Sequence, residues 1–121
     1  MADPADTICA LSTVPGRSGL AVVRVSGKNC RSIYRTIFKS RSSEQGPSHR
    51  EAVLGLIVDP DQGCNLDEAV AIHYFSPNSY TGEDMTEYSI HGNPVLIAAL
   101  LDGICNAGAR IAEPGEFTMR A

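Results

Sequence analysis

The sequence has no surplus of positive charge, no long apolar run and no secretion or transit signal, and each absence excludes a class of protein. The 10 lysine and arginine residues are scattered and are outnumbered by 14 aspartate and glutamate residues, whereas a nucleic-acid backbone is bound by a clustered positive face. No apolar stretch approaches the roughly 20 residues of a transmembrane helix. The acidic start, residues 1–6, resembles neither a transit peptide nor a signal peptide. We therefore expect a cytoplasmic domain without a membrane segment, which does not bind nucleic acid by itself.

The sequence also lacks the spacing of a metal site. No C-x-x-C pair is present and no histidine stands at ligand spacing. Glu83 and Asp84 are adjacent, so on a strand they would point apart, and no third ligand follows at a recognisable spacing. We interpret these two carboxylates as turn and cap residues. We expect no metal and four reduced structural thiols, Cys9, Cys30, Cys64 and Cys105.

Two catalytic motifs are missing as well. There is no G-x-S-x-G nucleophile elbow. Residues 26–29 resemble the end of a phosphate-binding loop, G-x-x-x-x-G-K-[ST], but Val22 replaces the first glycine and Asn29 replaces the hydroxyl residue that holds magnesium. His91 precedes a predicted helix and is interpreted as a hydrogen-bonding residue. The chain therefore offers no catalytic residue and no nucleotide site of that kind.

The length suits one domain, and the hydrophobic pattern predicts an α+β fold in the order β-β-α-β-β-β-α-β. Ser26 is predicted to cap the first helix, and Asn93 caps a second one that Gly108 ends. The second helix is apolar nearly all round, so we expect it to be buried on more than one side. The predicted strands are residues 7–11, 20–25, 51–58, 66–75 and 85–90, with an extended stretch at 110–120; the predicted helices are 28–39 and 94–107; turns or loops are predicted at 15–19, 39–48 and 59–63.

The most informative segment is the polar, glycine-bearing loop at residues 78–84, N-S-Y-T-G-E-D, which Glu87 follows closely. Three carboxylates fall within residues 83–87. The loop is too acidic for a core and too short for a linker. We interpret it as part of a small-molecule site, with the arginine-bearing residues 15–24 as its partner.

For Arg24 and Glu87 the residues alone leave two interpretations open. Arg24 is either a strand-edge arginine with its head in water or a partly buried guanidinium that holds a carboxylate or phosphate. Glu87 is either a solvated strand carboxylate, paired with Arg24, or an acceptor for two parallel N–H donors of a planar heterocycle. The edge of a pterin or a guanine fits the second geometry.

Taken together, six motifs closely resemble the amino-terminal domain of the MnmE (TrmE) family of tRNA-modification GTPases. The likeness covers residues 6–121, and two of the motifs are long and specific. The pattern departs from the family at Ser18 and Asn93, where glycine is common. The motifs are D-T-I at residues 6–8, P-G-R-x-G at 15–19, R-V-S-G at 24–27, P-N-S-Y-T-G-E-D at 77–84, H-G-x-P at 91–94 and P-G-E-F-T-x-R-A at 114–121.

This resemblance implies that residues 1–121 are the folate-binding and dimerisation domain of a longer protein. The implied fold is that of the folate-binding domain of aminomethyltransferases, with the terminal strand exchanged between subunits of a homodimer. The implied ligand is a reduced one-carbon folate, 5-formyl- or 5,10-methylene-tetrahydrofolate, in contact with Arg24 and Glu87. A third implied contact is a lysine that follows Ala121.

The resemblance also implies the activity of the whole protein. With the FAD-containing partner MnmG (GidA), it would modify carbon 5 of the wobble uridine of certain tRNAs. GTP, Mg²⁺ and K⁺ would bind in a GTPase domain outside this chain, which would not be catalytic alone. A second hypothesis is that the domain is mainly an assembly module without functional folate binding.

Overall fold

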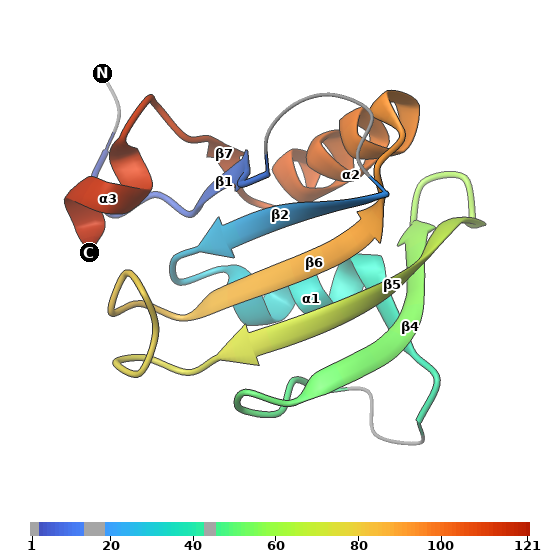
Figure 1. The fold of residues 1–121 in the computed structure, drawn as a ribbon, viewed down its shortest axis with the longest axis horizontal. Coiled ribbons are helices and arrows are strands. Elements are labelled where there is room, and N and C mark those ends of the chain that lie inside the picture. Colours follow the sequence, from blue (N-terminus) through green and yellow to red (C-terminus); the bar gives the residue numbers. More distant parts are fainter. Residues whose placement is uncertain (1–2, 14–18, 43–45) are drawn as a thin grey trace.

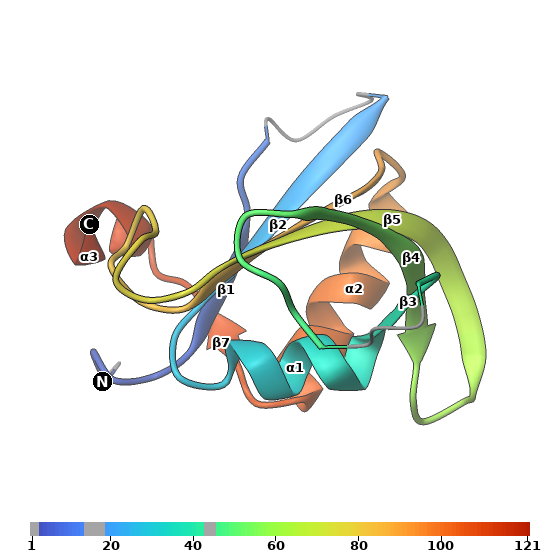
Figure 2. The same ribbon diagram turned by 90° about the horizontal axis from the view of Figure 1, so that it is seen from below.

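The computed structural model describes residues 3–13, 19–42 and 46–121, which form one curved sheet with two helices against one face (Figure 1 and Figure 2). The α+β class predicted from the hydrophobic pattern is confirmed. In chain order the elements are β1 (Ile8–Leu11), β2 (Leu20–Ser26), α1 (Cys30–Ile37), β3 (Phe38–Ser40), β4 (Ala52–Asp59), β5 (Cys64–Tyr74), β6 (Met85–His91), α2 (Pro94–Asn106), β7 (Arg110–Ile111) and α3 (Glu116–Arg120).

In the described residues the strand order across the sheet is β3-β4-β5-β6-β2-β1-β7. Neighbouring strands are antiparallel except for β1 and β7, which are parallel. The β4–β5 hairpin is the predicted one. The first strand thus lies next to the last, and the first described residues lie at the same end of the molecule as α3 (Figure 1).

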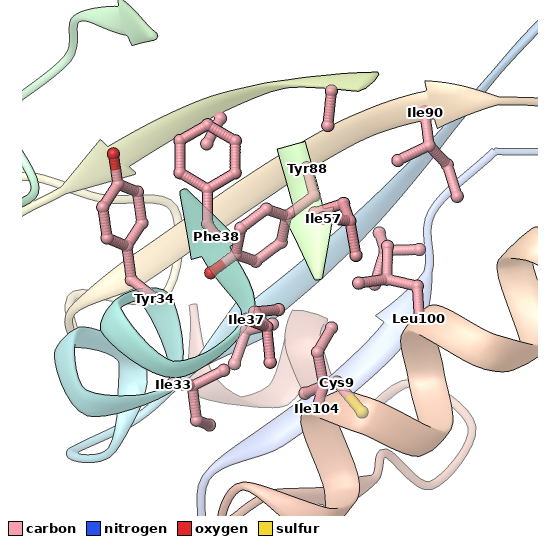
Figure 3. Packing of buried hydrophobic residues seen from close by; sticks show 14 of the residues in the cluster. Cys9, Ile33, Tyr34, Ile37, Phe38, Ile57, Tyr88, Ile90, Leu100 and Ile104 are labelled. Atoms are coloured by element: carbon pink, nitrogen blue, oxygen red, sulfur yellow. The ribbon is translucent and has the colours of Figure 1, made fainter. Parts of the chain in front are cut away.

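The core lies between the concave face of the sheet and the helices. Alternate residues of each strand face it, because successive side chains of a strand point to opposite faces. Val23 of β2 and Tyr88 of β6 are completely buried there, in one cluster with Ile33 of α1 and Ile104 of α2. Figure 3 shows Tyr88 on the sheet side of this core and Ile33 and Ile104 on its helix side. The remaining alternate residues, including Arg24 and Glu87, point to the other face of the sheet.

Helix α1 begins later and ends earlier than predicted. Its N-cap residue is Asn29 rather than Ser26, whose hydroxyl is instead held by side chains of the acidic loop, Thr81 at 2.7 Å and Glu83 at 2.8 Å. At Phe38 the backbone becomes extended (φ −120°, ψ 128°) and continues as β3 alongside β4. The expected loop at 39–48 therefore begins with a strand. Of the expected turn at 15–19, residues 15–18 lie outside the described part of the chain.

Helix α2 begins as predicted, because the side chain of Asn93 accepts a hydrogen bond from the Val95 amide at 2.8 Å. The expectation that it is buried on more than one side is wrong. Only Leu100 and Ile104 are fully buried, and Val95 is 76% exposed. The sheet and α1 cover one side of the helix, and in this chain its other apolar side faces solvent. None of the described helices has the length and apolarity needed to cross a bilayer.

The end of the chain also differs from the prediction. Only Arg110 and Ile111 form a strand, and Glu116–Arg120 is a short helix instead of an extended stretch. Gly115 adopts the left-handed conformation (φ 77°) that glycine tolerates best and turns the chain into α3. An ion pair between Glu116 and Arg120, one helical turn apart, supports the helix.

Candidate functional site

The structure brings Arg24 and Glu87 together. They are direct partners in the register of β2 and β6, and Nε of Arg24 donates to Oε2 of Glu87 at 2.7 Å. Both side chains are partly buried, with 35% and 18% of their surface exposed. The interpretation of Arg24 as a strand-edge residue is wrong, because β2 is paired with β6 on one side and β1 on the other. The pair therefore lies inside the sheet, where both backbones are fixed by ladder hydrogen bonds.

Two tyrosines complete this site, and sequence reasoning did not single out either as a site residue. The hydroxyl of Tyr74 donates to Oε1 of Glu87 at 3.0 Å, so each oxygen of that carboxylate has a donor. Burial, and next the hydrogen bond to Glu87, raise the pKa of Tyr74. The ring of Tyr80 lies 5.7 Å from the Arg24 guanidinium carbon, within the range of a cation–π contact. Tyr74 is diagonal to Glu87 across β5 and β6, so only the strand pairing reveals the contact.

The guanidinium of Arg24 keeps donors for a ligand. Its hydrogen bond to Glu87 uses Nε alone, and among the described residues neither terminal nitrogen has a hydrogen-bond partner. A cavity of about 340 Å³ adjoins Arg24. It is lined by the end of β1 (Ala10, Leu11), by Ser12 that follows it, and by residues 112–118. A planar donor group at the wall of a cavity is suited to an anionic or carbonyl-bearing ligand.

A larger cavity, of about 410 Å³, lies elsewhere, between α1, α2 and the β4–β5 turn. Neither Arg24 nor Glu87 lines it. Its walls include Ile57, Leu100 and Asp102, and the described structure places no lysine, arginine or histidine on them. The smaller cavity is the better candidate, because size alone does not orient a ligand and only the smaller one has a charged donor on its wall.

The carboxylates of the acidic loop hold the loop together. Glu83 accepts hydrogen bonds from Ser26 and, at 3.1 Å, from Arg120. Asp84 accepts from the Ser76 amide at 2.8 Å and from Arg31 at 3.0 Å. Burial, the largest single influence, would raise the pKa of Asp84, but these two hydrogen bonds together with the charges of Arg31 and His73 lower it. The described residues contain no cluster of three or more histidine, cysteine, aspartate or glutamate side chains that could hold a metal ion.

A chain of charges joins the two longest motifs. Arg120 of α3 bridges Glu83 of the acidic loop and Glu116, and Glu116 also binds both terminal nitrogens of Arg110 at 2.8 and 2.7 Å. Arg110 in turn donates to Asp6 near the start of the chain at 2.8 Å. The hydrogen bonds from Arg110, above all, lower the pKa of Glu116 to about 2. These contacts fix α3, and with it residues 112–118, against the loop that carries Tyr80.

His91 does not take part in this site. It lies at the far end of β6, with 67% of its side chain exposed, and its Nδ1 is 2.9 Å from the carboxylate of Asp67. The prediction that it is a hydrogen-bonding residue is confirmed. Burial alone would raise the pKa of Asp67, and the hydrogen bonds from His91 lower it.

Comparisons with known proteins agree with this arrangement of motifs. Residues 7–121 match the family described as "GTP-binding protein TrmE N-terminus". The chain is 47% identical over 116 residues to a protein of Aquifex aeolicus, 40% to one of Koribacter versatilis and 47% to one of Thermotoga petrophila, each named "tRNA modification GTPase MnmE". These alignments cover 96% of this chain but only 25 to 26% of each relative. The chain thus spans about a quarter of the length of these relatives.

Proposed function

Because the chain belongs to the family of TrmE amino-terminal domains, we propose that it binds a reduced one-carbon folate and dimerises a tRNA-modification GTPase. The observation that carries the folate proposal is that Arg24, which is paired with Glu87, lines a cavity of about 340 Å³. That volume lies within the range of small-molecule sites, about 300–1,000 Å³. It suits the pterin head, with the tail of the folate extending along the open face of the sheet.

The chemistry of the two side chains fits such a ligand. A pterin presents a ring N–H beside an exocyclic amine, and a carboxylate can accept both when it is held in plane. Arg24 and Tyr74 hold Glu87 in this way, each donating to one oxygen and leaving that oxygen further acceptor capacity. The terminal nitrogens of Arg24 can donate to a pterin carbonyl or to a carboxylate of the folate tail.

The rest of the proposal concerns the whole protein, of which this chain corresponds to about a quarter of its relatives' length. With MnmG, an FAD-containing partner, the dimer modifies carbon 5 of the tRNA wobble uridine in the cytoplasm. The folate supplies the one-carbon unit. GTP hydrolysis, with Mg²⁺ and K⁺, belongs to the part of the protein that follows.

Calorimetric titration with 5-formyltetrahydrofolate tests the folate site. Arg24→Ala and Glu87→Ala are each expected to weaken binding by roughly 10- to 100-fold, because each removes a charged hydrogen bond worth about 1.5–3 kcal/mol. The double variant should show no heat. Arg41→Ala is the matched control, since it removes another arginine of an ion pair, the one with Glu68, and neither of these residues lines the cavity or belongs to the acidic loop. Unchanged affinity in the double variant would remove both residues from the folate site.

The alternative, an assembly module without folate binding, has a specific observation in its favour. Arg24 and Glu87 are engaged with each other, since Nε of Arg24 donates to Glu87. The sheet face that carries them also exposes apolar side chains, with Leu20 61% and Leu54 47% exposed, which suits an interface. Sedimentation and calorimetry together discriminate the two hypotheses. A chain that sediments as a dimer but gives no heat of binding with any reduced folate favours assembly alone.

We also propose that residues 110–121 are exchanged between the subunits of the dimer. The segment suits exchange because β7 has only two residues and closes the sheet edge through a short ladder with β1, flanked by backbone hydrogen bonds from Arg110 to Thr7 and from Ala112 to Cys9. Deleting residues 110–121 is expected to give monomers or aggregates, because the edge of β1 is then open. A soluble dimer that survives the deletion would exclude the exchange.

A further inference from the structure

Two of the four cysteines face each other across the core. Figure 3 shows Cys9 of β1 beside α2. Its Sγ lies 3.7 Å from Sγ of Cys105, near the end of that helix. The residues are 96 positions apart in the sequence, so only the fold brings the thiols together. A disulfide has an S–S bond of about 2.05 Å, so closing this contact requires a small approach of the two sulfurs.

The other two thiols are not arranged in this way. The buried thiol of Cys30 donates to the backbone oxygens of Val25 and Asp84, both at 3.2 Å. Cys64 is exposed, at the start of β5, and no other thiol of the described residues contacts it. Cys9 and Cys105 are thus the one close thiol pair in the described part of the chain.

From this geometry we infer that Cys9 and Cys105 are an oxidative modification site, which a peroxide converts reversibly into a disulfide between β1 and α2. The inference is independent of the proposed function. The two thiols contact each other, and neither belongs to the Arg24 site. The sequence motifs do not include either cysteine.

The difference in exposure assigns the order of events. Cys105 is partly exposed, whereas Cys9 is completely buried and its burial raises the pKa of its thiol. The thiolate is the reactive form, so peroxide attacks first at Cys105. The Cys105 thiol and hydrogen peroxide give a sulfenic acid and water. The Cys9 sulfur then displaces the hydroxyl group, which forms the S–S bond and releases a second water; a thiol reductant reverses the change by exchange.

The bond would tie α2 to the strand that lines the candidate cavity. Ala10, next to Cys9, is the register partner of Arg24 and also lines the cavity. A disulfide that closes so long a loop restricts the unfolded chain, so the oxidised form is expected to unfold at a higher temperature than the reduced form. The modification would thereby couple the redox state to the rigidity of one wall of the site.

Intact mass and peptide mapping of the native chain after treatment with excess hydrogen peroxide test the inference. One linked peptide pair should contain Cys9 and Cys105, and its mass should be two hydrogen atoms below the sum of the two reduced peptides. A thiol reductant should restore the starting mass. Retention of all four thiols, or a bond only between Cys64 residues of two chains, overturns the inference.

Variants sharpen the test. Cys105→Ser should abolish the intramolecular disulfide, Cys9→Ala should leave a sulfenic acid on Cys105 that dimedone captures, and the matched control Cys64→Ser should oxidise like the parent chain. Persistence of the intramolecular disulfide in Cys105→Ser contradicts the assignment. If a variant does not fold, the linked peptides of the parent chain still decide the outcome, because they identify the two sulfurs directly.

Discussion

Replacing Glu116 with glutamine is expected to destabilise the chain at neutral pH and much less in acid. Glu116 accepts hydrogen bonds from two arginines and from the Glu113 amide, and its side chain is only 11% exposed. Glutamine keeps the shape but loses the charge, and it brings an amide N–H₂ toward the guanidinium of Arg110. The substitution therefore removes the charge without removing the packing.

The pKa of Glu116 sets the size of the effect. Its pKa is about 2 in the folded chain against an ordinary value of 4.5. This difference corresponds to about 3 kcal/mol at most. Because the carboxylate pairs with Arg110, 27% of whose side chain is exposed, solvent screening reduces the contribution, and we expect a loss of about 1–2 kcal/mol.

The sign of the pH dependence follows from the direction of the pKa change. A carboxyl group whose folded pKa is depressed stabilises the fold above its unfolded pKa, here 4.5, and this stabilisation is lost as the pH falls toward about 2. The difference between the Glu116→Gln variant and the parent chain should therefore be full at pH 7 and shrink steadily below pH 4.5. The same residue thus predicts both a magnitude and a pH window.

Urea unfolding followed by far-ultraviolet circular dichroism measures this, since the chain has no tryptophan. A loss of 1–2 kcal/mol lowers the urea midpoint by roughly 1 M. Glu113→Gln is the matched control, because that side chain is exposed and no described contact involves its carboxylate; its effect should stay within about 0.5 kcal/mol. Equal midpoints for Glu116→Gln and the parent at pH 7, or a difference that persists unchanged near pH 3, would refute the reasoning.

Three further predictions use the same unfolding measurement. Gly27→Ala should lower the free energy of unfolding by more than about 2 kcal/mol, because φ is 136° and a Cβ would lie 2.7 Å from Cα of Thr7. Gly63→Ala is the control and should cost only about 1 kcal/mol, because φ is 67° and no atom lies within 4 Å of the added Cβ. Equal costs would contradict the contact with Thr7. Tyr34→Phe should leave stability equal or higher by up to about 1 kcal/mol, since the buried hydroxyl has no partner among the described groups, and a clear loss would reveal a missed one. Mainly because of burial, the pKa of His73 is lowered from 6.5 to about 4, so the free energy of unfolding should fall as the pH drops from 6.5 toward 4. The His73→Gln variant should show a flatter dependence on pH in this range. An unchanged slope would exclude His73 as its source.

Periodicity in the sequence was enough to predict most strands and the start of α2, since apolar spacing and a capping asparagine act over a few residues. The sequence also suggested a contact between Arg24 and Glu87, and the register of β2 and β6 brings it about. The contact of Tyr74 with Glu87 was not predictable, because it depends on which strand pairs with β6 and on which diagonal.

In the terminal segment, the sequence predicted an extended stretch where the structure has a short helix. Residues 110–120 carry an extended-looking pattern with Pro114 and Gly115, and the local sequence does not reveal that Arg110 and Arg120 both reach Glu116. These ion pairs, together with the αL turn at Gly115, favour a helix over a strand. The apolar pattern of α2 likewise predicted that one side of the helix is buried, but it did not indicate that its other apolar side is exposed in this chain.

The parallel pairing of β1 with β7 has a consequence for how the chain is made. The ribosome produces β1 before all the other strands of this sheet, but its outer edge gains a neighbour only when residues 110–112 emerge, roughly a hundred residues later. At usual elongation rates of about 5–20 residues per second, that edge stays open for seconds. Nascent or prematurely terminated chains are therefore expected to depend on chaperones for protection during this interval, and premature stop codons shortly before Arg110 should yield insoluble products.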